Sequence, residues 1–155
     1  MKWDPEAAID DFRVVAELAG ILLSPHDIEI EKLPAPHKPP SRLPPGKMAV
    51  YVFHSGTTCL KVGKAGPKSQ ARYTSQHYSP KSAISTLAAS MLADGVAFGD
   101  ATFDETDVGQ WIKEHVDRVN FLLDAQQGMP VVTLLEAFLQ CRLMPKYEGF
   151  KSQQK

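Results

Sequence analysis

Four cationic or hydrogen-bonding side chains in one short stretch, residues 59 to 78, are the ones best suited to chemistry in this chain. They are Lys64, Lys68, Arg72 and His77, and no Asp or Glu lies among them. Lysine and arginine bind phosphate oxygens and stabilise negative charge that develops during attack on a phosphodiester. Histidine can accept or donate a proton near neutral pH. The segment therefore predicts a binding site for an anion, with nucleic acid as the expected partner.

The charge of the whole chain is segregated along the sequence. Residues 32 to 93 contain no acidic residue, whereas the rest of the chain holds all 18 acidic residues and eight of the 17 basic ones, a net charge of −10. The basic residues of this segment are Lys32, Lys38, Arg42, Lys47, Lys61, Lys64, Lys68, Arg72 and Lys81. Either the two parts pair with each other in the folded protein, or the basic part forms a face for a polyanion.

Length and composition favour a single globular domain. The chain has 155 residues, of which 43% are hydrophobic, enough for a buried core. Its longest apolar runs are shorter than a membrane span requires, and residues 4 to 11 are acidic where a signal peptide would be basic. We therefore expect a cytoplasmic protein without a membrane partner. Cys59 and Cys141 stand alone, which predicts two reduced thiols and no zinc site.

The first third of the chain predicts a helical extension, residues 1–31, and a proline-rich strap, residues 32–47. Asp4 as N-cap and Pro5 at the first helical position begin a helix whose apolar residues recur every three or four positions until Ser24–Pro25. A short extended piece, residues 28–33, follows. Six of the twelve prolines then lie between residues 34 and 46, where neither a helix nor a central strand can form. The extension and strap could bind a protein partner or a second copy of the chain.

The remaining residues, 48–150, predict an α+β domain, followed by a tail at 151–155. Two strand-like runs separated by a turn at Gly56 indicate a hairpin. Three helical segments, a third strand and a final helix follow; they are expected at residues 67–78, 82–95, 104–115, 116–124 and 130–144. The acidic residues Asp104, Glu105 and Asp107 would favour the start of the third helical segment, or else hold a metal ion.

Short motifs in this domain resemble those of the GIY-YIG nuclease superfamily. They are Ala49-Val50-Tyr51, Lys61-Val62-Gly63 followed by Lys64, Arg72 on the next helix, Glu136 on the last helix, and Pro145-Lys146-Tyr147. The resemblance covers residues 48 to 149. It implies a small three-stranded antiparallel sheet flanked by helices, and a DNA endonuclease that uses a single divalent ion, Mg²⁺ or Mn²⁺.

The resemblance also implies roles for individual residues. Tyr51, Lys64 and Arg72 fall on catalytic positions of the family, and Glu136 on the position of its metal ligand. His77 lies one residue beyond a position where the family often has His or Tyr. The candidate catalytic set is Tyr51, Lys61, Lys64, Arg72, His77 and Glu136; the candidate DNA-binding set is Lys64, Lys68, Arg72, Lys81 and Lys146.

Two positions depart from the family pattern. Lys61 replaces the second motif tyrosine, which commonly takes the proton from the attacking water, and Glu148 replaces an asparagine. Tyr51, His77 or a deprotonated Lys61 would then have to serve as the base. Two functions remain open from the sequence: a metal-dependent endonuclease, or a module on the same fold that binds nucleic acid or a protein partner without cleaving.

Overall fold

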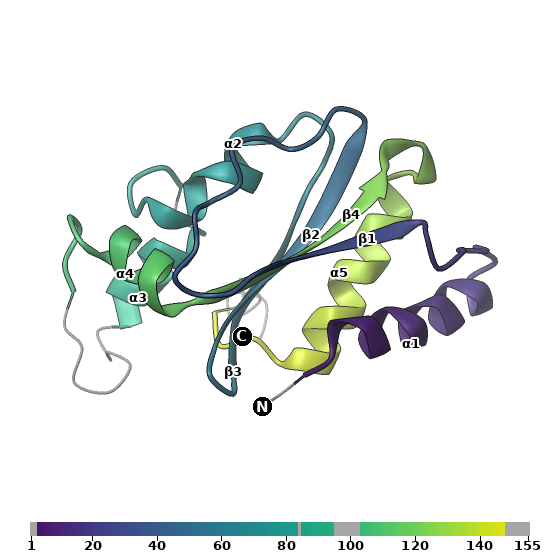
Figure 1. The fold of residues 1–155 in the computed structure, drawn as a ribbon, viewed down its shortest axis with the longest axis horizontal. Helices are drawn as coiled ribbons and strands as arrows, with labels where there is room; N and C mark the ends of the chain where they lie inside the picture. The colour runs from purple at the N-terminus through teal and green to yellow at the C-terminus, as the bar shows by residue number, and fades with distance from the viewer. Residues whose placement is uncertain (1–2, 84, 95–102, 148–155) are drawn as a thin grey trace, which may run out of the picture.

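The computed structural model describes residues 3–83, 85–94 and 103–147, which form an α+β fold around an antiparallel sheet. The strands are β1 (Ile28–Leu33), β2 (Lys47–Ser55), β3 (Thr58–Ala65) and β4 (Asp117–Asp124). The α-helices are α1 (Pro5–Leu18), α2 (Gln70–Thr74), α3 (Leu87–Asp94), α4 (Val108–His115) and α5 (Met129–Leu143), and two 3-10 turns are η1 (Gln76–Tyr78) and η2 (Ala125–Gln127). Figure 1 shows this arrangement.

The sheet has four strands in the order β1-β4-β2-β3, so the expectation of three strands is wrong. The added strand is β1, which pairs antiparallel with β4 from Ile28 opposite Leu123 to Leu33 opposite Arg118. Its Ile and Glu side chains alternate, which suits a strand with one apolar face. β1 also crosses the boundary expected at residue 31, so the N-terminal segment is part of the sheet.

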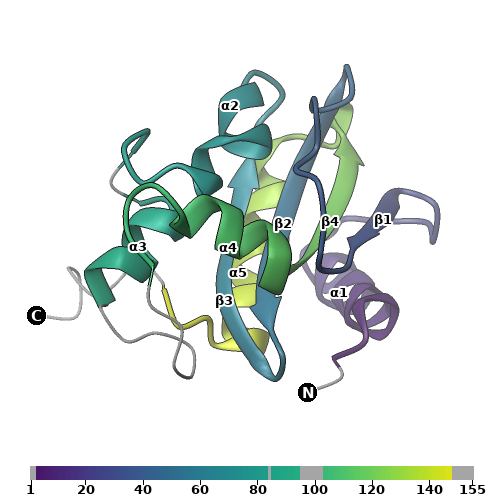
Figure 2. The same ribbon diagram turned by 60° about the vertical axis from the view of Figure 1, so that its left-hand side comes forward.

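Helices cover both faces of the sheet. On one face α1 and α5 pack against Val50, Val52 and Phe121. On the other, residues of α2, η1, α3 and α4 pack against Tyr51 and Phe53. Figure 2 shows α3 and α4 on one side of β2 and β3, with α5 on the opposite side. Any site that combines Tyr51 with a residue of α5 must therefore bridge two layers.

The hairpin and the helix ends differ in detail from the expectation. Only Gly56 and Thr57 separate β2 from β3, and Gly56 has a φ of 56°, which a tight turn accommodates without strain. α1 ends at Leu18, earlier than expected, and Gly20 follows with a φ of 82°. No helix in the described ranges is long and apolar enough to cross a membrane.

The main-chain amides of the proline-rich strap donate hydrogen bonds that hold it against the domain. The Ala35 amide donates to Asp117 Oδ1 (2.7 Å), and the His37 amide donates to the Lys113 carbonyl (2.8 Å). Further along, the Leu43 amide donates to Gln70 Oε1 (2.8 Å). Leu43 itself is buried in the core on the α2–α4 face. The strap thus links β1 to β2 across the helices of one layer.

Candidate active site

Three predicted site residues meet at the hydroxyl of Tyr51. Arg72 on α2 donates from Nε to this oxygen (3.1 Å) and to the Lys64 carbonyl (3.0 Å). His77 in η1 places Nε2 at 2.7 Å from the same hydroxyl. Tyr51 is fully buried in the middle of β2. The structure therefore joins Tyr51, Arg72 and His77 into one cluster, which we call the Tyr51 cluster.

The hydrogen bonds of His77 define which atom carries its proton. The Leu87 amide donates to Nδ1 (3.2 Å), so Nδ1 is unprotonated and the hydrogen is on Nε2. The Tyr51 oxygen then accepts from both His77 and Arg72, and its own hydrogen takes part in neither bond. Since both ring nitrogens of His77 are engaged, it orients Tyr51, and the prediction that it acts as a base is not supported by this geometry.

Burial dominates the electrostatics of the cluster. It lowers the pKa of His77 to about 2, with additional lowering by Lys61, Arg118 and Arg72. It also raises the pKa of Tyr51 to about 12, although Arg72 and Arg118 act in the opposite direction. Both side chains are therefore neutral in the folded protein at neutral pH.

The lowered pKa of His77 predicts acid sensitivity of the fold. An unfolded His77 would take up a proton near pH 6.5, whereas the folded one stays neutral to about pH 2. Below pH 6.5 the unfolded chain therefore binds the extra proton, and the free energy of unfolding should fall by up to about 1.4 kcal/mol per pH unit from this residue. Urea unfolding at several pH values would measure this slope. His77→Gln should reduce this slope by about one proton. An unchanged slope in His77→Gln would contradict the assignment.

Gly63 lets the Tyr51 ring lie across β3. The two residues are directly opposite each other in the β2–β3 pair, and a Cβ on Gly63 would come within 2.6 Å of the Tyr51 ring and hydroxyl. Gly63, the glycine of the second motif, therefore cannot carry a larger side chain unless Tyr51 moves.

Gly63→Ala is expected to push Tyr51 away from Arg72 and His77 and to lower the free energy of unfolding by about 1–3 kcal/mol. Urea unfolding would measure the stability. Gly66→Ala is the control, because its added Cβ would meet the flexible Met129 side chain at 3.5 Å and Ser69 Oγ at 4.0 Å, both ordinary van der Waals distances. Equal stability of the two variants would show that Tyr51 accommodates the methyl group.

Lys64 and Glu136 form an ion pair on the other side of β3. Lys64 Nζ lies 2.5 Å from Glu136 Oε2, and the side chains are 31% and 14% exposed. Glu136 contributes to raising the pKa of Tyr51, which places its carboxylate within electrostatic reach of the phenol. Arg72 binds the main chain of Lys64, so the two halves of the site are connected at β3, the outermost strand.

Lys61 is connected to the end of the described chain. Its Nζ lies 3.3 Å from the Tyr147 carbonyl, and the Tyr147 amide donates to the Leu60 carbonyl (2.9 Å). Lys146 pairs with Asp94 (2.8 Å). Lys61 is 6% exposed on the same side of β3 as Tyr51. Glu148, the second departure from the family pattern, lies outside the described residues.

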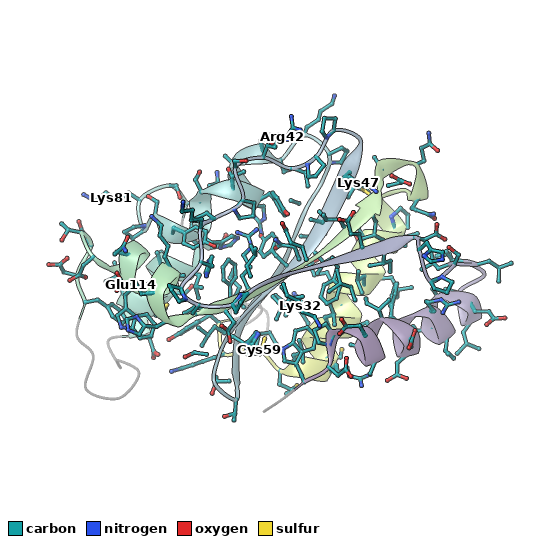
Figure 3. All side chains as sticks on the ribbon, in the orientation of Figure 1. Lys32, Arg42, Lys47, Cys59, Lys81 and Glu114 are labelled. Atoms are coloured by element: carbon teal, nitrogen blue, oxygen red, sulfur yellow. The ribbon has the colours of Figure 1, made fainter. Side chains whose placement is uncertain are left out.

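The basic segment does not form one continuous cationic face. Lys32, Lys47 and Lys81 lie far apart in Figure 3. At least four of its cations pair with acidic residues from elsewhere: Lys32 with Glu6, Lys47 with Asp124, Lys64 with Glu136, and Lys81 with Glu105. Of the five predicted DNA-binding residues, Lys64 and Arg72 lie at the candidate site, while Lys81 and Lys146 are paired with carboxylates away from it.

Lys68 and the acidic cluster are placed differently from the expectation. Lys68 lies in an exposed turn before α2, not on a helix face with Arg72. Asp104 accepts hydrogen bonds from the amides of Thr106 and Asp107 in a turn that precedes α4. Within the described ranges, no group of three or more His, Cys, Asp or Glu side chains is arranged to hold a metal ion.

Arg118 is a central residue that the sequence reasoning missed. It is fully buried on β4 and donates to Asn120 Oδ1 (2.7 Å), the Tyr78 hydroxyl (3.2 Å) and the Tyr73 carbonyl (2.6 Å). Its guanidinium also lies 5.4 Å from the centre of the Tyr51 ring. A signal was present, because Arg118 and Asn120 lie two positions apart, and so on the same face of a strand whose remaining inner residues, Val119, Phe121, Leu122 and Leu123, are apolar.

No protein-family model, curated protein or solved structure matches this chain. Its function has to be argued from the site itself.

Proposed function

We propose that this protein is a metal-dependent DNA endonuclease of the GIY-YIG type. The observation that carries the proposal is that the Tyr51 cluster and the Lys64–Glu136 pair lie on the two sides of the outer strand β3 and are joined by the hydrogen bond from Arg72 to the Lys64 carbonyl. The sequence motifs predicted that these residues belong to one site. A shared location for a phenol, two cations and a carboxylate suits the hydrolysis of a phosphodiester.

Each group has a role consistent with its contacts. Arg72 uses Nε to hold Tyr51 and the Lys64 main chain, so its terminal nitrogens are the part available to a phosphate. Lys64 adds a second cation once it separates from Glu136. Tyr51 keeps a hydroxyl hydrogen that neither His77 nor Arg72 uses, but its side chain is fully buried, so it would reach a phosphate oxygen or a water only if the site opens. It would act as a base only if bound cations lowered its pKa from about 12.

The residues present fit a single hard cation such as Mg²⁺ or Mn²⁺. Magnesium is usually held by one or two carboxylates together with waters and substrate phosphates, and Glu136 supplies one carboxylate at the candidate site. When bound, the ion would polarise the phosphate and stabilise its developing charge. Because Lys64 already contacts Oε2 of Glu136, the ammonium and a metal would compete for this oxygen.

The direct test is incubation of supercoiled plasmid with the purified protein and Mg²⁺ or Mn²⁺, followed by gel electrophoresis. Nicked or linear DNA that appears with the ion and disappears with a chelator would support the proposal. DNA that remains supercoiled in the presence of either ion would count against the endonuclease.

A second function, a module that binds nucleic acid without cleaving, is favoured by the environment of Lys61. This residue replaces the family's second tyrosine, and its Nζ contacts the Tyr147 carbonyl, as a structural lysine would. Retardation of DNA on a gel without any cleavage would favour this function. The affinity of the protein for DNA should then fall with rising salt, because Lys and Arg side chains that bind phosphates release the counterions of the DNA.

A further inference from the structure

A cavity lies between the start of α1 and strands β1, β2 and β4. Its volume is about 480 Å³, within the range of small-ligand sites. The residues that decide its chemistry are Trp3, Pro5, Lys32, His54, Asp117 and Val119. None of them belongs to the Tyr51 cluster or to the Lys64–Glu136 pair, so the proposed nuclease function does not use this cavity.

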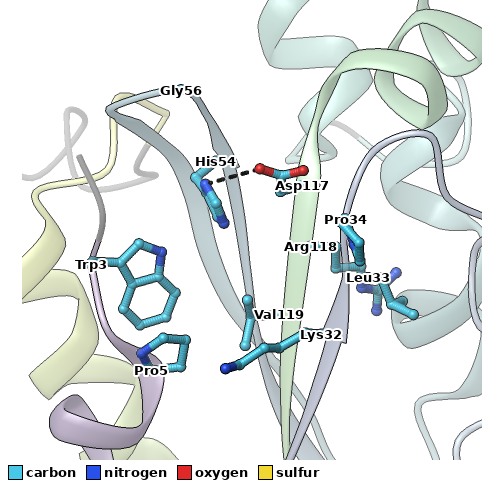
Figure 4. Close-up of a pocket in the computed structure, with 10 residues that line it drawn as sticks. All are labelled: Trp3, Pro5, Lys32, Leu33, Pro34, His54, Gly56, Asp117, Arg118 and Val119. Carbon is cyan, nitrogen blue, oxygen red and sulfur yellow. Dashed lines mark ion pairs between the residues drawn. The ribbon is translucent and has the colours of Figure 1, made fainter.

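Two hydrogen-bond acceptors face the cavity. Asp117 uses Oδ1 to bind the Ala35 amide (2.7 Å), while its Oδ2 lies 3.7 Å from His54 Nδ1, too far for a hydrogen bond. The carboxylate favours a hydrogen on Nδ1, which leaves Nε2 as an acceptor. In Figure 4 this second ring nitrogen points into the space between Trp3 and Val119.

His54 acts as a neutral group in this setting. Its burial lowers its pKa, while Asp117 opposes this change only in part. A neutral imidazole accepts a hydrogen bond and does not repel a cation. A donor placed in the cavity could bond to the two acceptors that face it, Asp117 Oδ2 and the unprotonated Nε2 of His54.

The other walls are aromatic and apolar. Trp3 stands edge-on to His54, with ring centres 6.0 Å apart and an interplanar angle of 88°. Pro5 and Val119 flank it in Figure 4. Lys32 is the cation at the rim, and its Nζ is already bound by Glu6 at 2.6 Å. Arg118 also lines the cavity, but its guanidinium is bonded to Asn120, Tyr78 and Tyr73. Among the described side chains, the charge that faces the cavity without an opposite charge bound to it is that of Asp117.

We propose that this cavity binds the guanidinium group of an arginine side chain from a partner protein. Guanidinium is planar and cationic, and it has several N–H donors, so it can bond to Asp117 Oδ2 and His54 Nε2 while its face contacts Trp3. The aliphatic stem of the arginine would lie along Pro5 and Val119. An anionic ligand such as a nucleotide would instead face the Asp117 and Glu6 carboxylates.

The test is a titration of the full chain with N-acetyl-arginine N-methylamide and with agmatine, followed by NMR of the Trp3 indole N–H. The neutral isostere, the corresponding citrulline amide, is the control ligand. We expect saturable shifts with both guanidinium compounds and at least about tenfold weaker binding of the citrulline amide. Binding of agmatine alone would indicate a free guanidine as the ligand. This result would support a guanidinium site but would contradict the proposal that an arginine of a partner protein occupies it.

Protein variants test the same contacts. Asp117→Asn keeps an oxygen for the Ala35 amide but removes the charge, and should weaken binding at least about tenfold. Asp124→Asn, at the other end of β4, should leave it unchanged. Trp3→Leu should also weaken binding and serves if Asp117→Asn fails to fold; because this variant lacks the indole, its titration is followed by the backbone amide signals of His54 and Val119. Equal binding of the citrulline amide or of N-acetyl-lysine N-methylamide, or no saturable shift up to about 10 mM, would overturn the proposal.

Discussion

Glu136→Gln is expected to lower the rate of plasmid cleavage by about 10²–10³-fold, because a bound metal contributes several kcal/mol to stabilising the reacting phosphate. Glutamine has almost the same shape but does not carry the charge that holds a divalent ion. The same change should not weaken DNA binding, because it releases Lys64 from its ion pair at 2.5 Å and removes a carboxylate that would repel phosphate. Cleavage assays and gel shifts on the same protein would therefore separate the two effects.

Two variants serve as controls for this experiment. Glu17→Gln changes an exposed glutamate on α1 and should leave both cleavage and DNA binding unchanged. Lys64→Met removes the competitor for Glu136, so Mn²⁺ should bind more tightly, as measured by calorimetry, while DNA binds more weakly. Cleavage by Glu136→Gln at the wild-type rate would remove Glu136 as the metal ligand.

Arg118→Met should lower the free energy of unfolding by about 3–5 kcal/mol, a large part of the stability of a domain this size. Methionine fills similar space but leaves Asn120 Oδ1, the Tyr73 carbonyl and the Tyr78 hydroxyl without their donors. It also removes the cation beside the Tyr51 ring. Urea unfolding followed by circular dichroism would measure the loss.

Arg142→Met is the matched control for Arg118. Arg142 pairs with Asp11 at 2.5 Å, but the two side chains are 40% and 60% exposed. Exposed ion pairs contribute about 0–1 kcal/mol, so this variant should unfold almost like the wild type. If both substitutions had equally small effects, the hydrogen bonds of Arg118 would contribute little to the stability of the fold.

Most of the fold could be predicted from local patterns. The β2–β3 hairpin, β4, the start of α1 at Pro5 after the N-cap Asp4, and the end of α5 before Pro145 follow from apolar periodicity, capping and proline. β1 was not assigned to the sheet because its six residues carry a weak signal and its partner strand lies about 90 positions away in the chain. The pairing depends on tertiary contacts that no local window contains.

The sequence predicted which residues belong to the candidate site better than it predicted how they are arranged. Tyr51, Arg72 and His77 do lie together, as their order in the motifs indicated. The role of His77 could not be anticipated, because it depends on a hydrogen bond from the Leu87 amide. The pairing of basic with acidic residues was one of the two open interpretations, and it holds for Lys32, Lys47, Lys64 and Lys81.

The way in which β3 is covered has a consequence for self-association. An outer strand normally presents unpaired main-chain groups that can recruit a strand from another molecule and start aggregation. Here the carbonyls of Cys59 and Leu60 are taken by the amides of Lys146 and Tyr147, and that of Lys64 by Arg72. Arg72, a member of the Tyr51 cluster, and the main chain of Lys146 and Tyr147 therefore protect this border of the sheet from intermolecular strand pairing.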